Sequence, residues 1–323
     1  MKQEEDYKST VSVVMATYNG EKYIREQIES ILNQSYPIYE LIIQDDCSTD
    51  ATPTICRDYE ATHPNVHFFR NEHNLGFNDN FRTAAMRTTG DYVAISDQDD
   101  IWFPEKIAKQ VATIGRHDIC TCLICRGETI EKAKTEPDSD DIRPGTHIFR
   151  CLLGHSILGE GKFMRNPENW EGSLNYDWNL TLHSDWNNGI VRIPEVLLFH
   201  RAHKNSVTHK TLALTNAPSK TAPYLHGYKI FCRLQQLPKF MSHCKYVYEH
   251  TKGAKDKGMK LQNKFTFLLL GHSFANYIRL CLFCMRHREA IYYPAYKAKG
   301  LIGISRGFFF PAFSAYYTSF NFL

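Results

Sequence analysis

Residues 11–20 read Val11-Ser-Val-Val-Met-Ala-Thr-Tyr-Asn-Gly20, a β-branched and apolar run that ends in polar side chains and a glycine. Similar runs follow at Leu41–Ile43, Val66–Phe69 and Tyr92–Ile95, with polar turns and helical periodicity between them. Strands that alternate with helices at intervals of roughly 25 to 30 residues favour right-handed βαβ crossovers and a parallel sheet. The first part of the chain therefore predicts an open α/β domain.

The composition divides the chain of 323 residues into two parts. An apolar fraction of 43% and a charged fraction of 23% exclude collagen, coiled coil and intrinsic disorder. The net charge of +3 conceals 21 Lys/Arg against 32 Asp/Glu in residues 1–209, and 17 against 3 in residues 210–323. The basic second part predicts contact with an anionic surface. The uncharged, aromatic residues 307–323 suit the headgroup region of a bilayer, with a tail folded back onto the domain as the alternative.

The N-terminus and the cysteines predict a cytoplasmic protein. Residues 1–10 are polar and lack the apolar stretch of a secretory signal, so the ten cysteines are expected as free thiols. Two clusters have the residue types of a zinc site without a complete ligand set. They are the cysteines Cys120, Cys122 and Cys125 and the histidines His200, His203 and His209.

An acidic segment, Ser96-Asp-Gln-Asp-Asp100, directly follows the run that ends at Ile95. Three carboxylates within four residues repel one another unless they are neutralised, and a hard divalent cation neutralises such a group. Mg²⁺ or Mn²⁺ that holds a pyrophosphate fits; an acidic turn that caps the next helix is the alternative. Because ligands of open α/β sheets bind at the carboxyl ends of strands, residues 16–19, 44–46 and 96–100 should share one crevice.

Five ordered segments resemble the nucleotide-sugar-binding half of family 2 inverting glycosyltransferases, which have the GT-A fold. The segments are Val11–Asn19, Ile43–Asp50, Asn74–Phe77, Gly90–Tyr92 and Ser96–Trp102. Residues Tyr176–Trp178 and Leu197–Asn205 more weakly resemble the acceptor-side half of bacterial rhamnosyltransferase-type members, which build surface polysaccharides. The resemblance implies a Rossmann-like, mostly parallel central sheet flanked by helices. The composition of residues 210–323 predicts, in addition, a helical, aromatic-rich C-terminal extension.

The chain is therefore expected to have four parts. They are a flexible N-terminus (1–9), a nucleotide-sugar-binding half (10–115), an acceptor-binding half (116–209) and a basic, helical, membrane-associating region (210–323).

The resemblance also assigns roles to single residues. Asp46 matches the acceptor of the uracil or thymine imide N–H, whereas Asp45 is expected to be structural. Asp99 matches a metal ligand, and Asp97 matches the residue on the ribose or on a metal-bound water. The family often has Gly where Cys47 stands, so the turn after Asp46 is expected to have a different shape. The residues expected at the donor nucleotide are Thr17, Tyr18, Asn19, Asp46, Asn74, Asn80, Asp97 and Arg201, and those expected at the metal are Asp97, Asp99 and His203.

An inverting transfer needs a base, because the acceptor hydroxyl must lose its proton as it attacks the anomeric carbon. Asp177, in Tyr176-Asp-Trp178, matches the base position of the family. Asp185, which precedes Trp186, is the rival.

The expected function is transfer of a sugar from a UDP-, dTDP- or GDP-sugar, with Mg²⁺ or Mn²⁺, to a saccharide or lipid-linked saccharide. It would serve O-antigen or capsule synthesis at the cytoplasmic face of the inner membrane. A catalytically inactive, membrane-associated homologue or scaffold is the alternative. A dinucleotide-dependent dehydrogenase is excluded because no Gly-x-Gly-x-x-Gly follows Met15, and the absence of a binding motif argues against nucleic acid.

Overall fold

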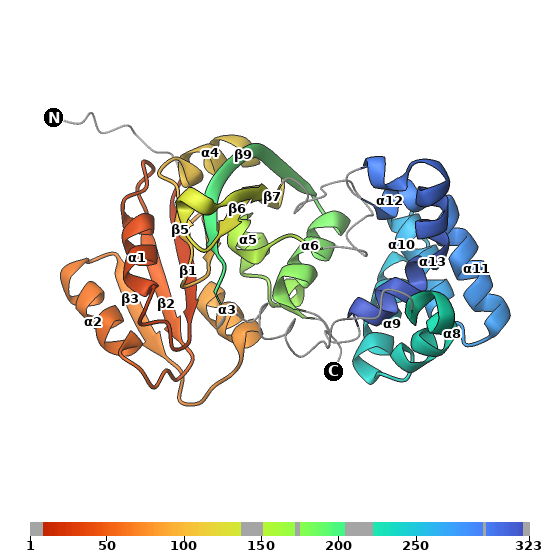
Figure 1. The fold of residues 1–323 in the computed structure, drawn as a ribbon. Coiled ribbons are helices and arrows are strands. Elements are labelled where there is room, and N and C mark those ends of the chain that lie inside the picture. The colour runs from red at the N-terminus through yellow and green to blue at the C-terminus, as the bar shows by residue number, and fades with distance from the viewer. Residues whose placement is uncertain (1–8, 137–150, 172–174, 204–221, 293–294, 319–323) are drawn as a thin grey trace. The chain divides into compact units, whose positions relative to one another are not determined.

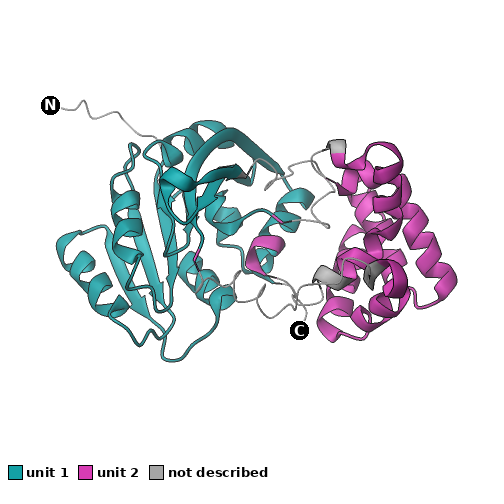
Figure 2. Cartoon of the chain, viewed as in Figure 1, with its two compact units in different colours: residues 1–140, 152–171, 179–202 teal, residues 141–151, 172–178, 203–323 magenta. Residues whose placement is uncertain are grey.

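The computed structural model describes residues 9–136, 151–171, 175–203, 222–292 and 295–318 (Figure 1). The chain forms two compact units (Figure 2). Unit 1 comprises Met1–Asp140, Leu152–Glu171 and Asn179–Ala202, and unit 2 comprises Asp141–Cys151, Gly172–Trp178 and His203–Leu323. The part boundaries expected after residues 9, 115 and 209 stay predictions.

Unit 1 is built on one sheet with the strand order β3-β2-β1-β4-β8-β6-β9-β5, and β7 pairs with β6. The strands are β1 (Val11–Thr17), β2 (Glu40–Asp45), β3 (Val66–Arg70), β4 (Tyr92–Ser96), β5 (Ile101–Trp102), β6 (Ile119–Gly127), β7 (Lys134–Glu136), β8 (Leu158–Glu160) and β9 (Ile190–Arg201). The four strands predicted from the sequence, β1 to β4, pair in parallel with one another, as do β6 and β9. The prediction of an α/β domain with a mostly parallel sheet is confirmed.

Helices flank this sheet (Figure 1). They are α1 (Ile24–Leu32), α2 (Thr52–Thr62), α3 (Phe77–Met86), α4 (Lys106–Ile114), α5 (Gly161–Met164) and α6 (Tyr176–Trp186), with 3-10 turns η1 (Ile130–Lys132), η2 (Gly154–Ser156) and η3 (Pro167–Trp170). Helix α1 shows why they form: Ile24, Ile28 and Ile31 recur on one face and are fully buried in the main hydrophobic core, which also includes residues of β1 and β2. Helix α6 begins in unit 2 and continues into unit 1.

The acidic segment after β4 crosses from one part of the sheet to another. Only four residues separate β4, in the middle of the strand order, from β5, yet β5 pairs with β9 at the end of that order. The sheet must therefore curl until β9 and β5 come near the end of β4. Ile101 lies opposite Phe199, so the residue before Ile101 reaches the end of β9. Asp97–Asp100 is thus placed between two strand ends.

The described part of unit 2 is helical, which confirms the predicted helical extension. Its elements are α8 (Ala222–Leu234), α9 (Pro238–Thr251), α10 (Lys257–Leu269), α11 (Phe274–Arg286), α12 (Arg288–Ile291), the 3-10 turn η4 (Ala295–Ala298) and α13 (Gly300–Thr318). Helix α13 packs against α8 and α11, and α9 packs against α10.

Helix α13 contains the described part of the aromatic stretch at residues 307–323. Its small residues allow close packing, since a Cβ at Gly307 would lie 2.9 Å from Cα of Met285 on α11. Ala312 and Ala315 are buried. The stretch from 307 to 318 therefore folds back onto unit 2, which is the alternative that the sequence left open, and residues 319–323 lie outside the described residues. Among the described residues, no helix is both long and apolar enough to cross a bilayer.

Candidate functional site

Hydrogen bonds join the polar residues that follow β1, β2 and β4, which we call the strand-end site (Thr17–Gly20, Asp45–Asp50 and Asp97–Asp100). The backbone N–H of Tyr18 donates to Oε1 of Gln98 (2.9 Å), and Nε2 of Gln98 donates to the Tyr18 carbonyl (3.1 Å). Oδ1 of Asn19 accepts from the backbone N–H of Thr49 (2.8 Å). The three segments therefore contact one another, whereas the ligand crevice expected between them stays a prediction.

Gly20 and the residues before it show how closely the segments approach. A Cβ at Gly20 would lie 2.2 Å from Oε1 of Gln98, so only glycine at this position leaves room for the Gln98 side chain. Thr17 is buried, and its hydroxyl donates to Oδ1 of Asp45 (3.2 Å), whereas the ring of Tyr18 is half exposed. Of the three residues expected at the nucleotide here, Tyr18 and Asn19 are exposed to solvent and Thr17 is not. Their roles stay predictions.

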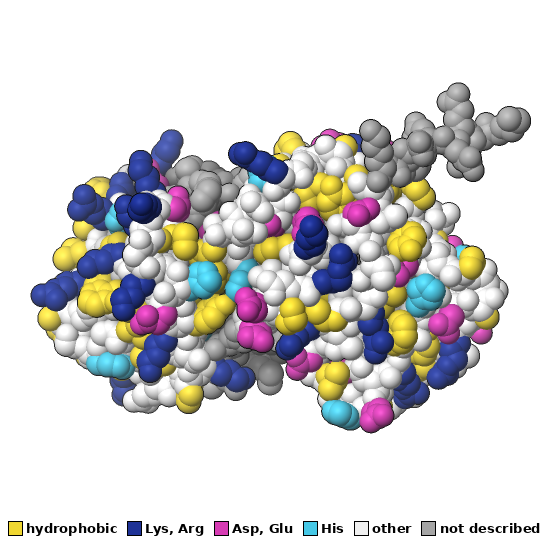
Figure 3. Space-filling model, turned by 180° about the vertical axis from the view of Figure 1, so that it is seen from behind, with side chains coloured by type: hydrophobic (Ala, Val, Ile, Leu, Met, Phe, Trp, Pro, Cys, Tyr) yellow, Lys and Arg dark blue, Asp and Glu magenta, His cyan; other side chains and the backbone are white. Residues whose placement is uncertain are grey.

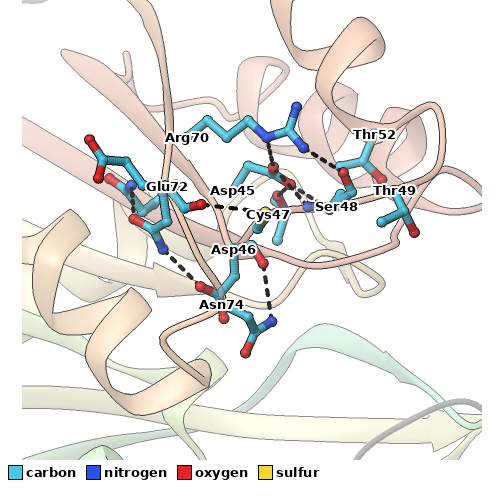
Figure 4. A network of polar contacts seen from close by, with 12 residues as sticks. Asp45, Asp46, Cys47, Ser48, Thr49, Thr52, Arg70, Glu72 and Asn74 are labelled. Atoms are coloured by element: carbon cyan, nitrogen blue, oxygen red, sulfur yellow. Dashed lines mark hydrogen bonds and ion pairs between the residues drawn. The ribbon is translucent and has the colours of Figure 1, made fainter.

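The first carboxylate of the β2 corner, as we call Asp45–Thr52, is enclosed by donors (Figure 4). Asp45 is fully buried and accepts from the backbone N–H (3.1 Å) and the hydroxyl of Ser48. Nε of Arg70 lies 3.4 Å from Oδ2 of Asp45, and the same guanidinium donates to the Ser48 carbonyl (2.8 Å). Asp45 therefore closes the corner, in agreement with the structural role expected for it.

Asp46 is buried as well, and both of its carboxylate oxygens accept hydrogen bonds from the protein. Oδ1 accepts from Nδ2 of Asn71 (2.8 Å) and from the N–H of Leu75 (2.7 Å), and Oδ2 accepts from the N–H of Gly76 (2.9 Å). Asp46 thus shapes the turn before α3. A carboxylate has about four lone-pair sites, so room for a nucleobase N–H remains on Oδ2. Recognition of the base by Asp46 stays a prediction.

The two asparagines expected at the nucleotide wall also support this turn. Nδ2 of Asn74, an exposed residue, donates to the Asp46 carbonyl (3.1 Å; Figure 4). Asn80 is buried on α3, where it donates to the Gln44 carbonyl (2.9 Å) and accepts from Asn71 (2.8 Å). Asn74 therefore lies nearer to solvent than Asn80. Contact of either with a nucleotide stays a prediction.

Cys47 has a backbone φ of +67°. This left-handed region costs a residue with a Cβ about 1–2 kcal/mol, and glycine enters it without that cost. Its thiol lies 3.9 Å from the Glu72 carbonyl. Cys47 thus has a backbone conformation that suits glycine, and the expectation of a differently shaped turn stays a prediction.

The β4 corner, which we define as Ser96–Trp102, contains carboxylates at different depths. The side chain of Asp97 is 36% exposed, whereas that of Asp100 is fully buried. Nδ1 of His155, from η2, lies 3.1 Å from Oδ2 of Asp97 and 3.0 Å from Oδ2 of Asp100. Nδ1 of His200, at the end of β9, lies 3.0 Å from Oδ1 of Asp100. The curled sheet therefore places two imidazoles against the buried carboxylate.

The electrostatics of this group are those of a buried ion pair. Burial pushes the pKa of Asp100 up, but the charge and hydrogen bonds of His155 and His200 outweigh it and hold that pKa far below its ordinary value. Burial alone would lower the pKa of His155. The charges and hydrogen bonds of Asp100 and Asp97 raise this pKa well above its ordinary value instead. The two carboxylates therefore favour the protonated form of His155.

Two sets of residues could hold a divalent cation. Asp97 fits because its carboxylate is partly exposed and oxygen is the ligand that Mg²⁺ and Mn²⁺ prefer. The described residues also contain a cluster of Asp100, His155 and His200, whose candidate ligand atoms lie within 4.8 Å of one another. The cluster contains none of Asp97, Asp99 and His203, the ligands implied by the resemblance, and the ligand roles of Asp97 and Asp99 stay predictions.

Arg201 and His203, expected at the diphosphate and the metal, lie in different units. Nε of Arg201 donates to the Asp99 carbonyl (3.1 Å), and its guanidinium pairs with Glu26 and lies 4.7 Å from the ring centroid of Tyr23. Arg201 is therefore already held against α1. His203 belongs to unit 2. Both roles stay predictions.

The two candidate bases lie on one helix. Asp177 is in the first turn of α6 in unit 2, half-buried, and its Oδ1 accepts from the N–H of Trp178 (2.8 Å). Asp185 is in the last turn, eight residues later, which is about 12 Å along a helix axis. The two carboxylates thus cannot serve the same reacting atom. The choice between them stays a prediction.

His155 is the residue of this site that sequence reasoning missed. It lies in a region without clear periodicity, 58 residues after Asp97 in the chain, and no motif marks it. His200 was noticed as part of a polar cluster, but its pairing with Asp100 depends on the contact between β5 and β9. The buried cluster could have been predicted only if the pairing of β5 with β9 had been predicted first.

Comparison with known proteins supports the resemblance. Residues 12–170 match the model of the family described as Glycosyl transferase family 2. Three relatives are "Putative glycosyltransferase EpsE" and "Putative teichuronic acid biosynthesis glycosyltransferase TuaG" of Bacillus subtilis, and "dTDP-rhamnosyl transferase RfbG" of Shigella flexneri. They are 42%, 41% and 37% identical over 33%, 33% and 30% of this chain. The matches span 39%, 42% and 35% of the relatives' own lengths, which is less than half of each.

Two solved structures share the fold. TarS 1-349 of S. aureus, in complex with UDP-GlcNAc, has a TM-score of 0.59 at 15% identity and covers 96% of this chain and 91% of its own. The mannosyltransferase PcManGT of Pyrobaculum calidifontis, in complex with GDP-Man and Mn²⁺, has a TM-score of 0.56 at 16% identity and covers 97% and 88%. The expected GT-A-type fold is confirmed. By sequence, residues 12–170 therefore form a glycosyl transferase family 2 domain, and the two solved structures show the same fold.

Proposed function

We propose that this protein transfers a sugar, with inversion, from a nucleoside diphosphate donor to a saccharide or lipid-linked saccharide acceptor in the synthesis of a bacterial surface polysaccharide. The observation that carries the proposal is the strand-end site, where three strand ends meet and Asp97 presents a partly exposed carboxylate within the family-matched residues. The names of TuaG and RfbG agree with such a pathway. An inactive homologue is not favoured, because the carboxylates Asp46, Asp97, Asp99 and Asp177 are all present.

In the proposed reaction, different residues of the chain act on the donor and on the acceptor. Tyr18 offers a half-exposed ring beside the backbone that Gln98 holds, and Asp97 and Asp99 would hold the cation near the donor diphosphate. A bound Mg²⁺ or Mn²⁺ would stabilise the negative charge of the departing diphosphate. Asp177 would take the proton of the acceptor hydroxyl. UDP-, dTDP- and GDP-sugars all fit these groups.

Paired substitutions on α6 test the proposed base. Asp177→Asn should lower sugar transfer by about 100-fold or more, the usual contribution of a general base. It should keep the rise in melting temperature that we expect UDP-, dTDP- or GDP-sugars with Mn²⁺ to give the wild-type protein, because binding stabilises the fold by mass action. Asp185→Asn, eight residues away on the same helix, is the control and should retain transfer within about threefold. The reverse pattern would assign the base to Asp185, and full activity of both variants would refute a base on α6.

We further propose that unit 2 binds an anionic membrane surface, and that the first turns of α13 make the contact. Leu301 and Ile302 are 84% and 69% exposed, and the exposed cations Lys299 and Arg306 flank them. Lys and Arg side chains recur over the surface of unit 2 in Figure 3, with few acidic ones between them. Exposed aliphatic groups among cations favour the interface of an anionic bilayer. The half-buried Phe308–Phe310 are less available for this contact.

Vesicle binding tests this surface. The double substitution Leu301→Asp with Ile302→Asp should lower co-sedimentation with phosphatidylglycerol-containing vesicles by about tenfold, because it replaces inserted apolar groups with charges that anionic lipid repels. Acidic residues are well tolerated in a first helical turn, so the fold should persist. Leu225→Asp changes an equally exposed leucine of α8 and is the control. Undiminished binding of the double variant would refute the surface.

A further inference from the structure

One ring nitrogen of His155 joins the outer carboxylate of the β4 corner to the buried one. Its Nδ1 lies 3.1 Å from Asp97 and 3.0 Å from Asp100, and the exposure of the side chains falls from Asp97 to His155 to Asp100. We propose that His155 is a positioning residue, which fixes the carboxylate of Asp97 for the divalent cation. This inference rests on the proposed function, in which Asp97 holds that cation.

The segment that carries His155 is itself anchored in the core. Nε2 of Gln110, on α4, donates to the carbonyls of Ser156 (2.8 Å) and Cys120 (3.1 Å). The hydroxyls of Ser156 and Thr121 lie 2.6 Å apart. A residue that orients a ligand group must be held by its own contacts, and η2 meets this requirement. The imidazole of His155 is thus held in place by the core, and its contact restricts the orientation of the partly exposed Asp97 carboxylate.

His155 also prevents repulsion between two carboxylates. Asp97 and Asp100 approach the same nitrogen, and like charges at such distances disfavour one another unless a donor lies between them. Without the imidazole, Asp97 would turn toward solvent, where water satisfies it. A cation would then have to restore its orientation on binding, which lowers affinity. The orientation of Asp97 before the cation arrives is therefore the property that His155 controls.

His200 supplies a matched control. Its Nδ1 contacts the other oxygen of Asp100, Oδ1, at 3.0 Å, so loss of either histidine removes one imidazole from the same buried carboxylate. Loss of His155 also removes the contact with Asp97. Nε2 of His155 is buried and has no hydrogen-bond partner among the described residues, so the ring acts through Nδ1. An asparagine places its amide nitrogen near the position of Nδ1, which makes His155→Asn the conservative variant.

The test compares the full chain with His155→Ala, His155→Asn and His200→Ala. MnCl₂ is added alone, and the free ion is measured by electron paramagnetic resonance. His155→Ala should raise the Mn²⁺ dissociation constant by about tenfold or more, as the loss of an outer-shell partner does. His155→Asn should recover most of the affinity, and His200→Ala should stay within about threefold of the wild type. Amide exchange of residues 97–101 without metal should be faster in His155→Ala than in His200→Ala.

Three results would overturn the proposal. Unchanged Mn²⁺ affinity in His155→Ala would remove its basis, and an equal loss in His200→Ala would indicate general damage to the buried group. Mn²⁺ binding that survives Asp97→Asn with Asp99→Asn but is lost in His155→Ala would place the ion inside the cluster. If the wild-type protein transfers sugar without binding Mn²⁺, the metal requirement of the proposed function is wrong. The amide exchange of residues 97–101 then tests His155 by itself. Faster exchange confined to His155→Ala supports its role in positioning Asp97, and unchanged exchange refutes that role.

Discussion

The β2 corner and the β4 corner begin alike and differ in what surrounds their carboxylates. Both follow parallel strands of the same sheet, and both contain adjacent aspartates. In the β2 corner, Asp45 and Asp46 are buried and protein donors reach both oxygens of each. In the β4 corner, Asp100 is equally buried, but Asp97 remains partly exposed. Adjacent carboxylates at a strand end thus do not define a ligand site; their exposure and their donors do.

The sharpest test of this difference is a pair of isosteric substitutions with opposite effects. Asp97→Asn should lower sugar transfer on the order of 100- to 1000-fold, because the cation at the departing diphosphate loses a negatively charged carboxylate ligand. Its free energy of unfolding should change by less than about 1 kcal/mol, since the side chain is partly exposed. Transfer rates at saturating donor and urea denaturation measure the two effects.

Asp45→Asn is the counterpart in the β2 corner and should lower the free energy of unfolding by about 3 kcal/mol. The substitution leaves the Ser48 donors and Arg70 with a neutral partner in a buried place. Loss of one partner of a buried ion pair costs about 3–5 kcal/mol of unfolding free energy. Because Arg70 is partly exposed, we expect the cost here at the lower end of this range. Transfer by the folded fraction should remain within about tenfold of the wild type. A large activity loss with unchanged stability would show that the two corners do not differ as proposed.

The sequence predicted the part of this architecture that repeats. The four strands β1 to β4 and the helix after Gly20 were predicted because apolar periodicity is a local signal. The meeting of three strand ends then followed from the geometry of parallel sheets. Strand β5 has two residues, too few for a periodic signal, and its pairing with β9 depends on how the whole sheet curls.

The contacts that distinguish the corners could not be predicted for the same reason. Asp46 receives donors from Asn71 and the Leu75–Gly76 backbone, 25 to 30 residues later in the chain. Asp100 is paired with His155 and His200, which only tertiary structure brings to one point. Residue types at strand ends indicate which chemistry is possible there. Burial and long-range donors decide which carboxylate remains available for a ligand.

One basic residue beside each corner, Arg70 and Lys106, predicts a difference in pH dependence. Arg70 is partly exposed, whereas Lys106 is fully buried, with Nζ 3.7 Å from the ring centroid of Trp102 and 3.0 Å from Oε1 of Gln110. Burial lowers the pKa of Lys106 to about 8, from 10.5 for an ordinary lysine. The unfolded chain therefore binds more protons between these two values, and Lys106 makes the folded state more stable as pH rises through this window.

Lys106→Met removes this titration. The unfolding free energy of the wild type minus that of Lys106→Met should increase by about 2 kcal/mol from pH 7 to pH 9.5, measured by urea denaturation. The corresponding difference for Arg70→Met should stay constant, because arginine does not titrate in this range. A constant difference for Lys106→Met would mean that the buried ammonium is solvated or more strongly paired than the structure indicates.

The smallest expected effect concerns backbone strain, which distinguishes the corners once more. Cys47 holds a positive φ in the β2 corner, whereas the residues 96–102 of the β4 corner, all of them described, include none. Cys47→Gly should raise the free energy of unfolding by about 0.5–1 kcal/mol, because relief of the Cβ strain exceeds the greater entropy that glycine has in the unfolded chain. Cys47→Ala loses the thiol contact with Glu72 but keeps the strain, so it should not gain stability. If both variants gain equally, the thiol rather than the φ angle limits the stability of this turn, and the two corners differ in their donors alone.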